Sequence, residues 1–68
     1  MKLYRLITDV DSSTFCHRVS EATSGGWSLH GSPTMAFNAE TGVMMCGQAV
    51  TKEVADEDYH RDIKLGAY

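Results

Sequence analysis

Five side chains in this sequence could bind a metal ion: Cys16, His17, His30, Cys46 and His60. Structural zinc sites usually take their ligands in closely spaced pairs. Here Cys16 and His17 are adjacent, so they point to different sides of a helix, and the others are scattered along the chain. We therefore predict no metal site and no cofactor. The five side chains are interpreted as core cysteines and surface histidines.

Catalysis by a cysteine nucleophile requires a thiolate within hydrogen-bond distance of a base. His30 and Cys46 could lie on one face of a sheet, but the strand pairing predicted below places Thr34 opposite Cys46, and no third group orients the histidine. The segment TDVDSST offers hydroxyls at the start of a helix, an end that often attracts anions. Asp9 and Asp11 already occupy that end and would repel a phosphate. We predict no catalytic residue.

The composition excludes several classes of partner. The chain has 68 residues, with six Lys+Arg against nine Asp+Glu and a formal net charge of -3. It has no basic patch, and phosphate neutralisation dominates nucleic-acid affinity, so we predict no nucleic-acid partner. No apolar run is long enough to span a bilayer, and aspartates come too early for a signal peptide, so we predict no membrane partner. We expect a cytoplasmic protein whose two cysteines are reduced and buried.

The first half of the chain predicts a strand followed by a helix. Residues 2–8 are short and rich in apolar side chains, which favours a strand. Asp11 is the expected N-cap of the helix, with Val10 packing on Phe15 as a hydrophobic staple. Ser24 and two glycines follow, and we expect Gly25 to end the helix in the left-handed conformation.

Two further strands are predicted around the turn at residues 38–42. Positions 27–37 alternate, with Trp27, Leu29 and Phe37 among the odd-numbered residues expected under the helix. Pro33 cannot donate to a neighbouring strand, which places it on a sheet edge or in a bulge. The predicted register pairs Phe37 with Val43, Met35 with Met45, Pro33 with Gly47, Gly31 with Ala49 and Leu29 with Thr51.

These elements predict an α+β fold in the order strand–helix–strand–strand, with one helix packed on a three-stranded, mainly antiparallel sheet. We expect the last strand in the middle and the Pro33 strand at an edge. Residues 1–54 form the single predicted domain. Residues 55–68 are charged and lack a consistent period, so they are expected to form a flexible tail in which Ile63 and Leu65 could dock.

Two segments taken together resemble a known family: KLYRLITD at the start, and GGWSLHGSP followed by CGQAVTKEV. The spacing W-x-L-x-G-x-P, at Trp27, Leu29, Gly31 and Pro33, directly follows a helix that ends in Gly-Gly. Over roughly residues 1–54, the chain is similar to the proteins of domain-of-unknown-function family 1737. The resemblance implies a compact α+β domain of bacteria or their phages, with no established activity and no known catalytic residues to carry over.

The predicted sheet has a second face, opposite the helix, that is partly apolar. The candidate binding residues on this face are His30, Thr34, Met44, Cys46, Gln48 and Val50. A chain of this size has a marginal core, and an exposed apolar patch usually marks an interface. We therefore expect a non-enzymatic interaction or oligomerisation module that binds an unknown protein or itself. In a homodimer, Met44, Cys46 and Val50 are expected to be buried between the chains.

Two alternatives remain open. The first is a small-ligand-binding or catalytic protein that uses the strip His30, Thr34, Cys46 and Gln48 on the same face. The second is a regulatory domain that works fused to, or beside, a larger protein. The sequence does not rank substrate classes or name a partner.

Overall fold

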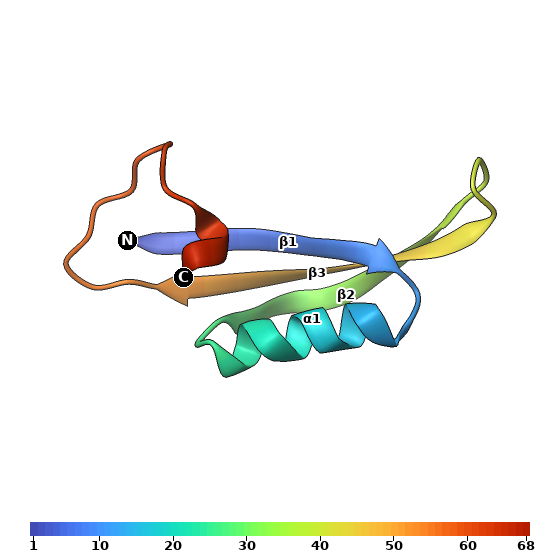
Figure 1. Ribbon diagram of the computed structural model, residues 1–68, viewed down its shortest axis with the longest axis horizontal. Coiled ribbons are helices and arrows are strands. Elements are labelled where there is room, and N and C mark those ends of the chain that lie inside the picture. The colour runs from blue at the N-terminus through green and yellow to red at the C-terminus, as the bar shows by residue number, and fades with distance from the viewer.

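The computed structural model covers residues 1–68 and confirms the predicted α+β architecture (Figure 1). The elements in chain order are β1 (Lys2–Val10), α1 (Ser13–Ser24), β2 (Ser28–Asn38), β3 (Val43–Glu53) and a short 3₁₀ helix, η1 (Leu65–Ala67). β3 lies in the middle of the sheet and runs antiparallel to both neighbours, as predicted. The molecule measures 44 × 23 × 20 Å, and the β2–β3 hairpin extends past the ends of β1 and α1 (Figure 1).

The start of α1 differs from the prediction. Ser12, with an extended backbone (φ -157°, ψ 170°), is the N-cap residue, and its side chain makes no capping hydrogen bond. Asp11 instead donates its backbone N–H to the carbonyl of Met44 at 2.8 Å, which ties the β1–α1 connection to the hairpin. With Ser12 as the cap, Val10 and Phe15 do not occupy the two positions that a hydrophobic staple joins, so that prediction is wrong.

The two glycines end α1, but Gly26 (φ +96°) and not Gly25 (φ -86°) is left-handed. The N–H of Gly26 donates to the carbonyl of Thr23 at 3.3 Å, and the N–H of Trp27 donates to that of Ala22 at 3.0 Å. These two bonds form a Schellman motif. Trp27 and Ala22 are both buried in the core. The motif therefore leads the chain from α1 into β2 with the indole facing inward.

The predicted register of the β2–β3 hairpin is wrong by one residue. Asn38 pairs with Val43, so the turn spans residues 39–42 and not 38–42. Asn38 holds this shorter turn, because its carbonyl accepts the N–H of Gly42 at 2.7 Å and its side-chain oxygen accepts the N–H of Glu40 at 3.1 Å. The pairs next to the turn shift accordingly: Phe37 faces Met44, and Met35 faces Cys46.

A bulge in the middle of β2 shifts the register a second time. Residues 31–33 together lie opposite Gln48 alone. Gly31 has a φ of +72°, and Pro33 lacks a backbone N–H, which makes both residues suited to a bulge. Because the bulge adds two residues, it preserves the alternation of side chains along β2. The odd-numbered residues of β2 therefore lie on the helix side of the sheet both before and after the bulge.

The core lies between the sheet and α1 and is small. Its central cluster consists of Leu3, Ile7, Ala22, Trp27 and Val50. In all, 8 of the 68 residues are buried. A chain of this length buries only about 60% of the surface that its unfolded form exposes, so little apolar area is available to stabilise it. The prediction that the odd-numbered residues of the segment 27–37 lie under the helix holds for Trp27 but is wrong for Leu29 and Phe37, which are 59% and 62% exposed.

The C-terminal segment returns to the same side of the sheet as α1. Ile63, Leu65 and Tyr68 pack against the central cluster. The ammonium of Lys52 donates to the carbonyls of Gly25 and Tyr68, which connects this segment to the end of α1. Figure 1 shows η1 next to the beginning of β1. The domain boundary after residue 54 and the flexibility of residues 55–68 stay predictions.

Candidate functional site

One face of the sheet carries no helix, and we call it the open face. Directly paired residues of antiparallel strands share a face. Val50 lies in the core under α1, so its partners Arg5 and Leu29 are on the helix side, and the residues adjacent to them in sequence point the other way. Between the pair Lys2–Glu53 at one end and the pair Asn38–Val43 at the other, the open face consists of Tyr4, Leu6, Thr8 and Val10 from β1, Ser28, His30, Thr34 and Ala36 from β2, and Met45, Gly47, Ala49 and Thr51 from β3.

The open face is apolar along β1 and lacks charge over most of its length. Tyr4 is 55% exposed, Leu6 is 56% exposed, and Val10 is also exposed. The charged pair Lys2–Glu53 lies at one end of the face, and the twelve residues that define it include no Asp, Glu, Lys or Arg. Large apolar side chains that are exposed together on one sheet face often mark an interface.

In the middle of the open face, side chains from the two neighbouring strands fill the space above Gly47. A Cβ atom at Gly47 would lie 2.9 Å from Oγ1 of Thr34, 3.6 Å from Cγ2 of Thr8 and 3.7 Å from Cδ1 of Leu6. Thr34 also donates its hydroxyl to the carbonyl of Gly47 at 3.4 Å. The two outer strands thus fill the space above the central glycine, and the resulting surface is suited to packing against another sheet.

The structure does not bring the six predicted binding residues onto one face. His30 and Thr34 lie on the open face, whereas Met44, Cys46, Gln48 and Val50 lie on the helix side. The one-residue error in the register near the turn exchanged the two faces of β3. Val50 is fully buried and Cys46 nearly so, which leaves neither able to contact a second chain. The strip His30, Thr34, Cys46 and Gln48 is likewise divided between the two faces.

The side chain of Gln48 forms hydrogen bonds to the backbone at the bulge in β2. Its side-chain amide donates to the carbonyls of His30 at 3.4 Å, Gly31 at 3.3 Å and Ala49 at 2.9 Å. The side chain is buried, and buried polar groups are tolerated when they are hydrogen-bonded. Gln48 therefore satisfies backbone carbonyls that the bulge removes from regular strand pairing.

The two cysteines are free thiols in different surroundings. Cys46 is buried, and burial raises the pKa of its thiol, with a further increase from the nearby carboxylate of Asp11. Cys16 is exposed, so the prediction that both cysteines are buried is wrong for this one. No group of three His, Cys, Asp or Glu side chains is placed to hold a metal ion. No helix is long and apolar enough to cross a membrane.

A second apolar surface lies on the helix side of the protruding hairpin. Met35 and Phe37 are more than half exposed, and Met44, which pairs with Phe37, is also exposed. The hairpin that carries this surface extends past the beginning of α1 (Figure 1). The surface involves the two strands of the hairpin, whereas the open face involves all three strands of the sheet.

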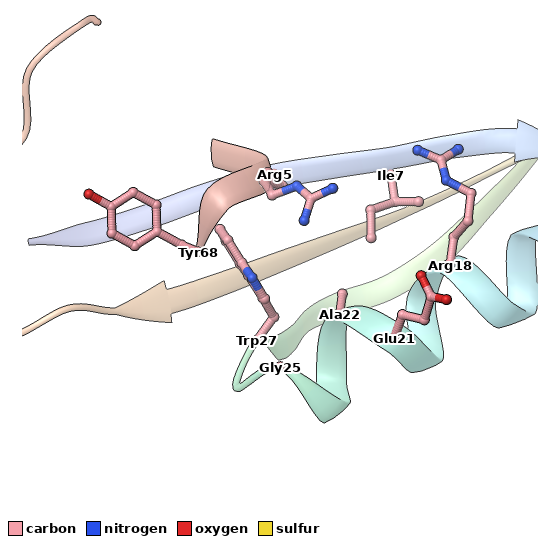
Figure 2. A pocket seen from close by; sticks show the side chains of 9 residues that line it. Arg5, Ile7, Arg18, Glu21, Ala22, Gly25, Trp27 and Tyr68 are labelled. Carbon is pink, nitrogen blue, oxygen red and sulfur yellow. The ribbon is translucent and has the colours of Figure 1, made fainter. Parts of the chain in front are cut away.

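A pocket of about 280 Å³ lies on the helix side, between β1, the end of α1 and the C-terminal segment (Figure 2). Its walls combine apolar, aromatic and charged groups. The residues that line it are Arg5, Ile7, Arg18, Glu21, Ala22, Gly25, Trp27, Gly66 and Tyr68. Figure 2 shows Trp27 and Tyr68 at one end and Arg18 with Glu21 toward the other, with Arg5 between them.

The two arginines at this pocket differ in whether their side chains have hydrogen-bond and ion-pair partners. Arg18 donates to the carbonyl of Thr8 at 2.8 Å and to the carboxylate of Asp9 at 3.2 Å. The guanidinium of Arg5 lies over the Trp27 ring, 5.2 Å from its centroid, and makes no hydrogen bond or ion pair. Arg5 therefore has unused donors beside an aromatic ring.

Sequence reasoning missed these pocket residues, although part of the signal was present. Arg5 is two residues from Ile7 along a strand, and Arg18 is four residues from Ala22 along a helix. Both spacings place an arginine on the same face as a core residue. Tyr68 had no comparable signal, because the irregular segment that carries it has no periodicity.

Residues 1–53 match the model of a family described as a domain of unknown function, DUF1737. The chain belongs to this family. The match spans β1, α1, β2 and β3, so the open face of this DUF1737 domain lies entirely within it, whereas Gly66 and Tyr68 of the pocket lie outside. No curated protein and no solved structure matches the chain.

Proposed function

We propose that this DUF1737 domain is a non-enzymatic interaction module that associates with a second copy of itself through the open face. The observation that carries the proposal is the exposure of Tyr4 and Leu6 on a sheet face with no helix and no central charge. A chain with so small a core gains stability from a partner that covers this face.

The absence of charge favours a second copy over a partner recognised by its charge. Two chains of net charge -3 repel each other, and this repulsion is weakest when the surfaces that meet carry no charge of their own. In a two-fold dimer the same patch meets itself, so any charged group near the axis would face a like charge. The open face avoids this conflict, and two such faces can pack as aligned sheets about 10 Å apart.

The size of the open face sets the expected strength of the dimer. Strands of this length give a face roughly 30 Å long and 14 Å wide. Two faces of that size bury roughly 840 Å² in total, which is below the range of about 1,200–2,000 Å² for stable specific interfaces and is typical of weak, transient ones. We therefore expect a dissociation constant on the order of micromolar, and not the tight association of an obligate dimer.

We also place the protein in the cytoplasm. Both cysteines are free, and Cys16 is exposed. Exposed thiols persist in reducing compartments and tend to be oxidised outside them.

Sedimentation velocity at micromolar concentrations tests the proposal with two matched variants. Leu6 on the open face and Leu29 on the helix side of β2 are 56% and 59% exposed. We expect the wild type and the Leu29→Asp variant to sediment as dimers and the Leu6→Asp variant to sediment as a monomer. Circular dichroism checks that the Leu6→Asp variant is folded. A monomeric wild type, or a dimer lost with Leu29→Asp or Phe37→Asp but kept with Leu6→Asp, overturns it. Tyr4→Lys replaces Leu6→Asp if the latter does not fold.

A further inference from the structure

The helix-side pocket carries an inference that is independent of the open face. It lies between β1, the last turn of α1 and the C-terminal segment, on the opposite side of the sheet from the proposed dimer contact. Ile7, Ala22 and Trp27 give it an apolar wall that belongs to the core. Arg5 and Arg18 supply positive charge, and Glu21 supplies negative charge.

Arg5 is the pocket cation whose donors are unused. Arg18 is held by Thr8 and Asp9, and the ammonium of Lys52, 6.0 Å from the centroid of Trp27, is held by two backbone carbonyls. The guanidinium of Arg5 lies over the Trp27 ring, 5.2 Å from its centroid, and no hydrogen bond or ion pair holds it. Stacking occupies the flat surface of a guanidinium and leaves the N–H groups along its edge free.

We propose that this pocket binds a small organic carboxylate carrying a single negative charge. The edge of the Arg5 guanidinium matches a carboxylate through two parallel N–H···O bonds, which are among the stronger charge-assisted hydrogen bonds. The apolar part of the ligand lies against Ile7, Ala22 and Trp27. The pocket volume of about 280 Å³ is near the lower limit for small-molecule sites, so the ligand is small.

Glu21 sets the charge of the ligand. Its carboxylate lines the pocket and has no ion-pair partner in the structure. Because Asp9 already neutralises Arg18, Arg5 is the one pocket arginine left to pair with a ligand carboxylate, and the charge of Glu21 opposes any second negative charge on the ligand. A divalent anion such as phosphate is therefore disfavoured relative to a monocarboxylate.

Trp27 is the only tryptophan in the chain, so its fluorescence reports directly on the pocket. Titration of the full chain with benzoate should change this fluorescence saturably in the millimolar range or below. Acetate, which lacks an apolar body, and inorganic phosphate should each bind at least tenfold more weakly. Calorimetric titration with benzoate checks the same affinity without relying on the indole.

The variants separate a specific site from general surface charge. Arg5→Gln should weaken benzoate binding at least tenfold, whereas Arg61→Gln, which removes an arginine outside the pocket, should leave it unchanged. Glu21→Gln should tighten binding, a result that a purely structural role for Arg5 does not produce. The Glu21→Gln variant also tests the proposal if the Arg5→Gln variant does not fold.

Three results would overturn the carboxylate site. The first is a wild-type protein with no saturable response to benzoate, and the second is phosphate binding at least as strong as that of benzoate. The third is an equal loss of benzoate affinity in the Arg5→Gln and Arg61→Gln variants. Because Leu6 is outside the pocket, the same titration on the Leu6→Asp variant shows whether binding depends on dimerisation.

Discussion

The buried side-chain amide of Gln48 donates to three backbone carbonyls, those of His30 and Gly31 at the bulge of β2 and that of Ala49 in β3. Replacing Gln48 with methionine keeps its approximate shape but leaves these carbonyls without the amide donor. We expect Gln48→Met to lower the free energy of unfolding by about 1–3 kcal/mol, measured by urea denaturation. Thr34→Val is the control: it removes a single hydrogen bond of 3.4 Å from an exposed residue, and we expect a change in the free energy of unfolding within about 0.5 kcal/mol. Equal stability of both variants would contradict this role.

The two thiols should react at different rates in the folded protein. Cys46 is buried and its thiol pKa is raised, so little of the reactive thiolate forms and reagents do not reach it. We expect a disulfide reagent to modify Cys16 rapidly under native conditions and both cysteines after denaturation. Native Cys16→Ser protein should then be almost unreactive, and native Cys46→Ser protein should react like wild type. Rapid modification of both thiols in the native wild type would show that Cys46 is accessible.

At the scale of elements, the end of α1 offers a matched pair of glycine substitutions. Gly26 has a φ of +96°, where an alanine is strained, whereas Gly25 has a φ of -86° and room for a Cβ at ordinary contact distance. We expect Gly26→Ala to cost about 1 kcal/mol or more of stability and Gly25→Ala to cost clearly less, by thermal or urea unfolding. A larger loss for Gly25→Ala would contradict the Schellman assignment.

The elements themselves could be predicted from the sequence because their signals are local. The apolar run of β1, the glycines after α1 and the alternation from Trp27 to Phe37 each act within a few residues. The central place of β3 followed from joining the hairpin to a strand–helix–strand unit. The helix cap was missed because Asp11 and Ser12 are both good caps, and the contact of Asp11 with Met44 is a tertiary one.

The register could not be predicted, because it depends on hydrogen bonds between strands. The side chain and carbonyl of Asn38 close a turn one residue shorter than expected, and the bulge at residues 31–33 then adds two residues to β2. Pro33 indicated a bulge but not its length. The predicted binding residues of β3 were placed on the wrong face for the same reason, since a one-residue slip in the register moves every side chain of β3 to the other face.

At the scale of the whole molecule, the fold places two independent surfaces on opposite sides of one thin sheet. The open face is apolar and neutral, whereas the helix side carries the core, the arginines and the pocket closed by the C-terminal segment. A chain with 8 buried residues has little stability to spare. Dimerisation through the open face therefore should raise the unfolding temperature as protein concentration increases.

The most direct test of the central claim is an isotope-filtered NMR measurement of contacts between copies. In a mixed sample of ¹³C-labelled and unlabelled chains, we expect intermolecular nuclear Overhauser effects from the methyl groups of Leu6, Val10 and Met45 on the open face. Contacts arising instead from Leu29, Met35 or Phe37, or no such contacts at concentrations well above micromolar, would contradict it.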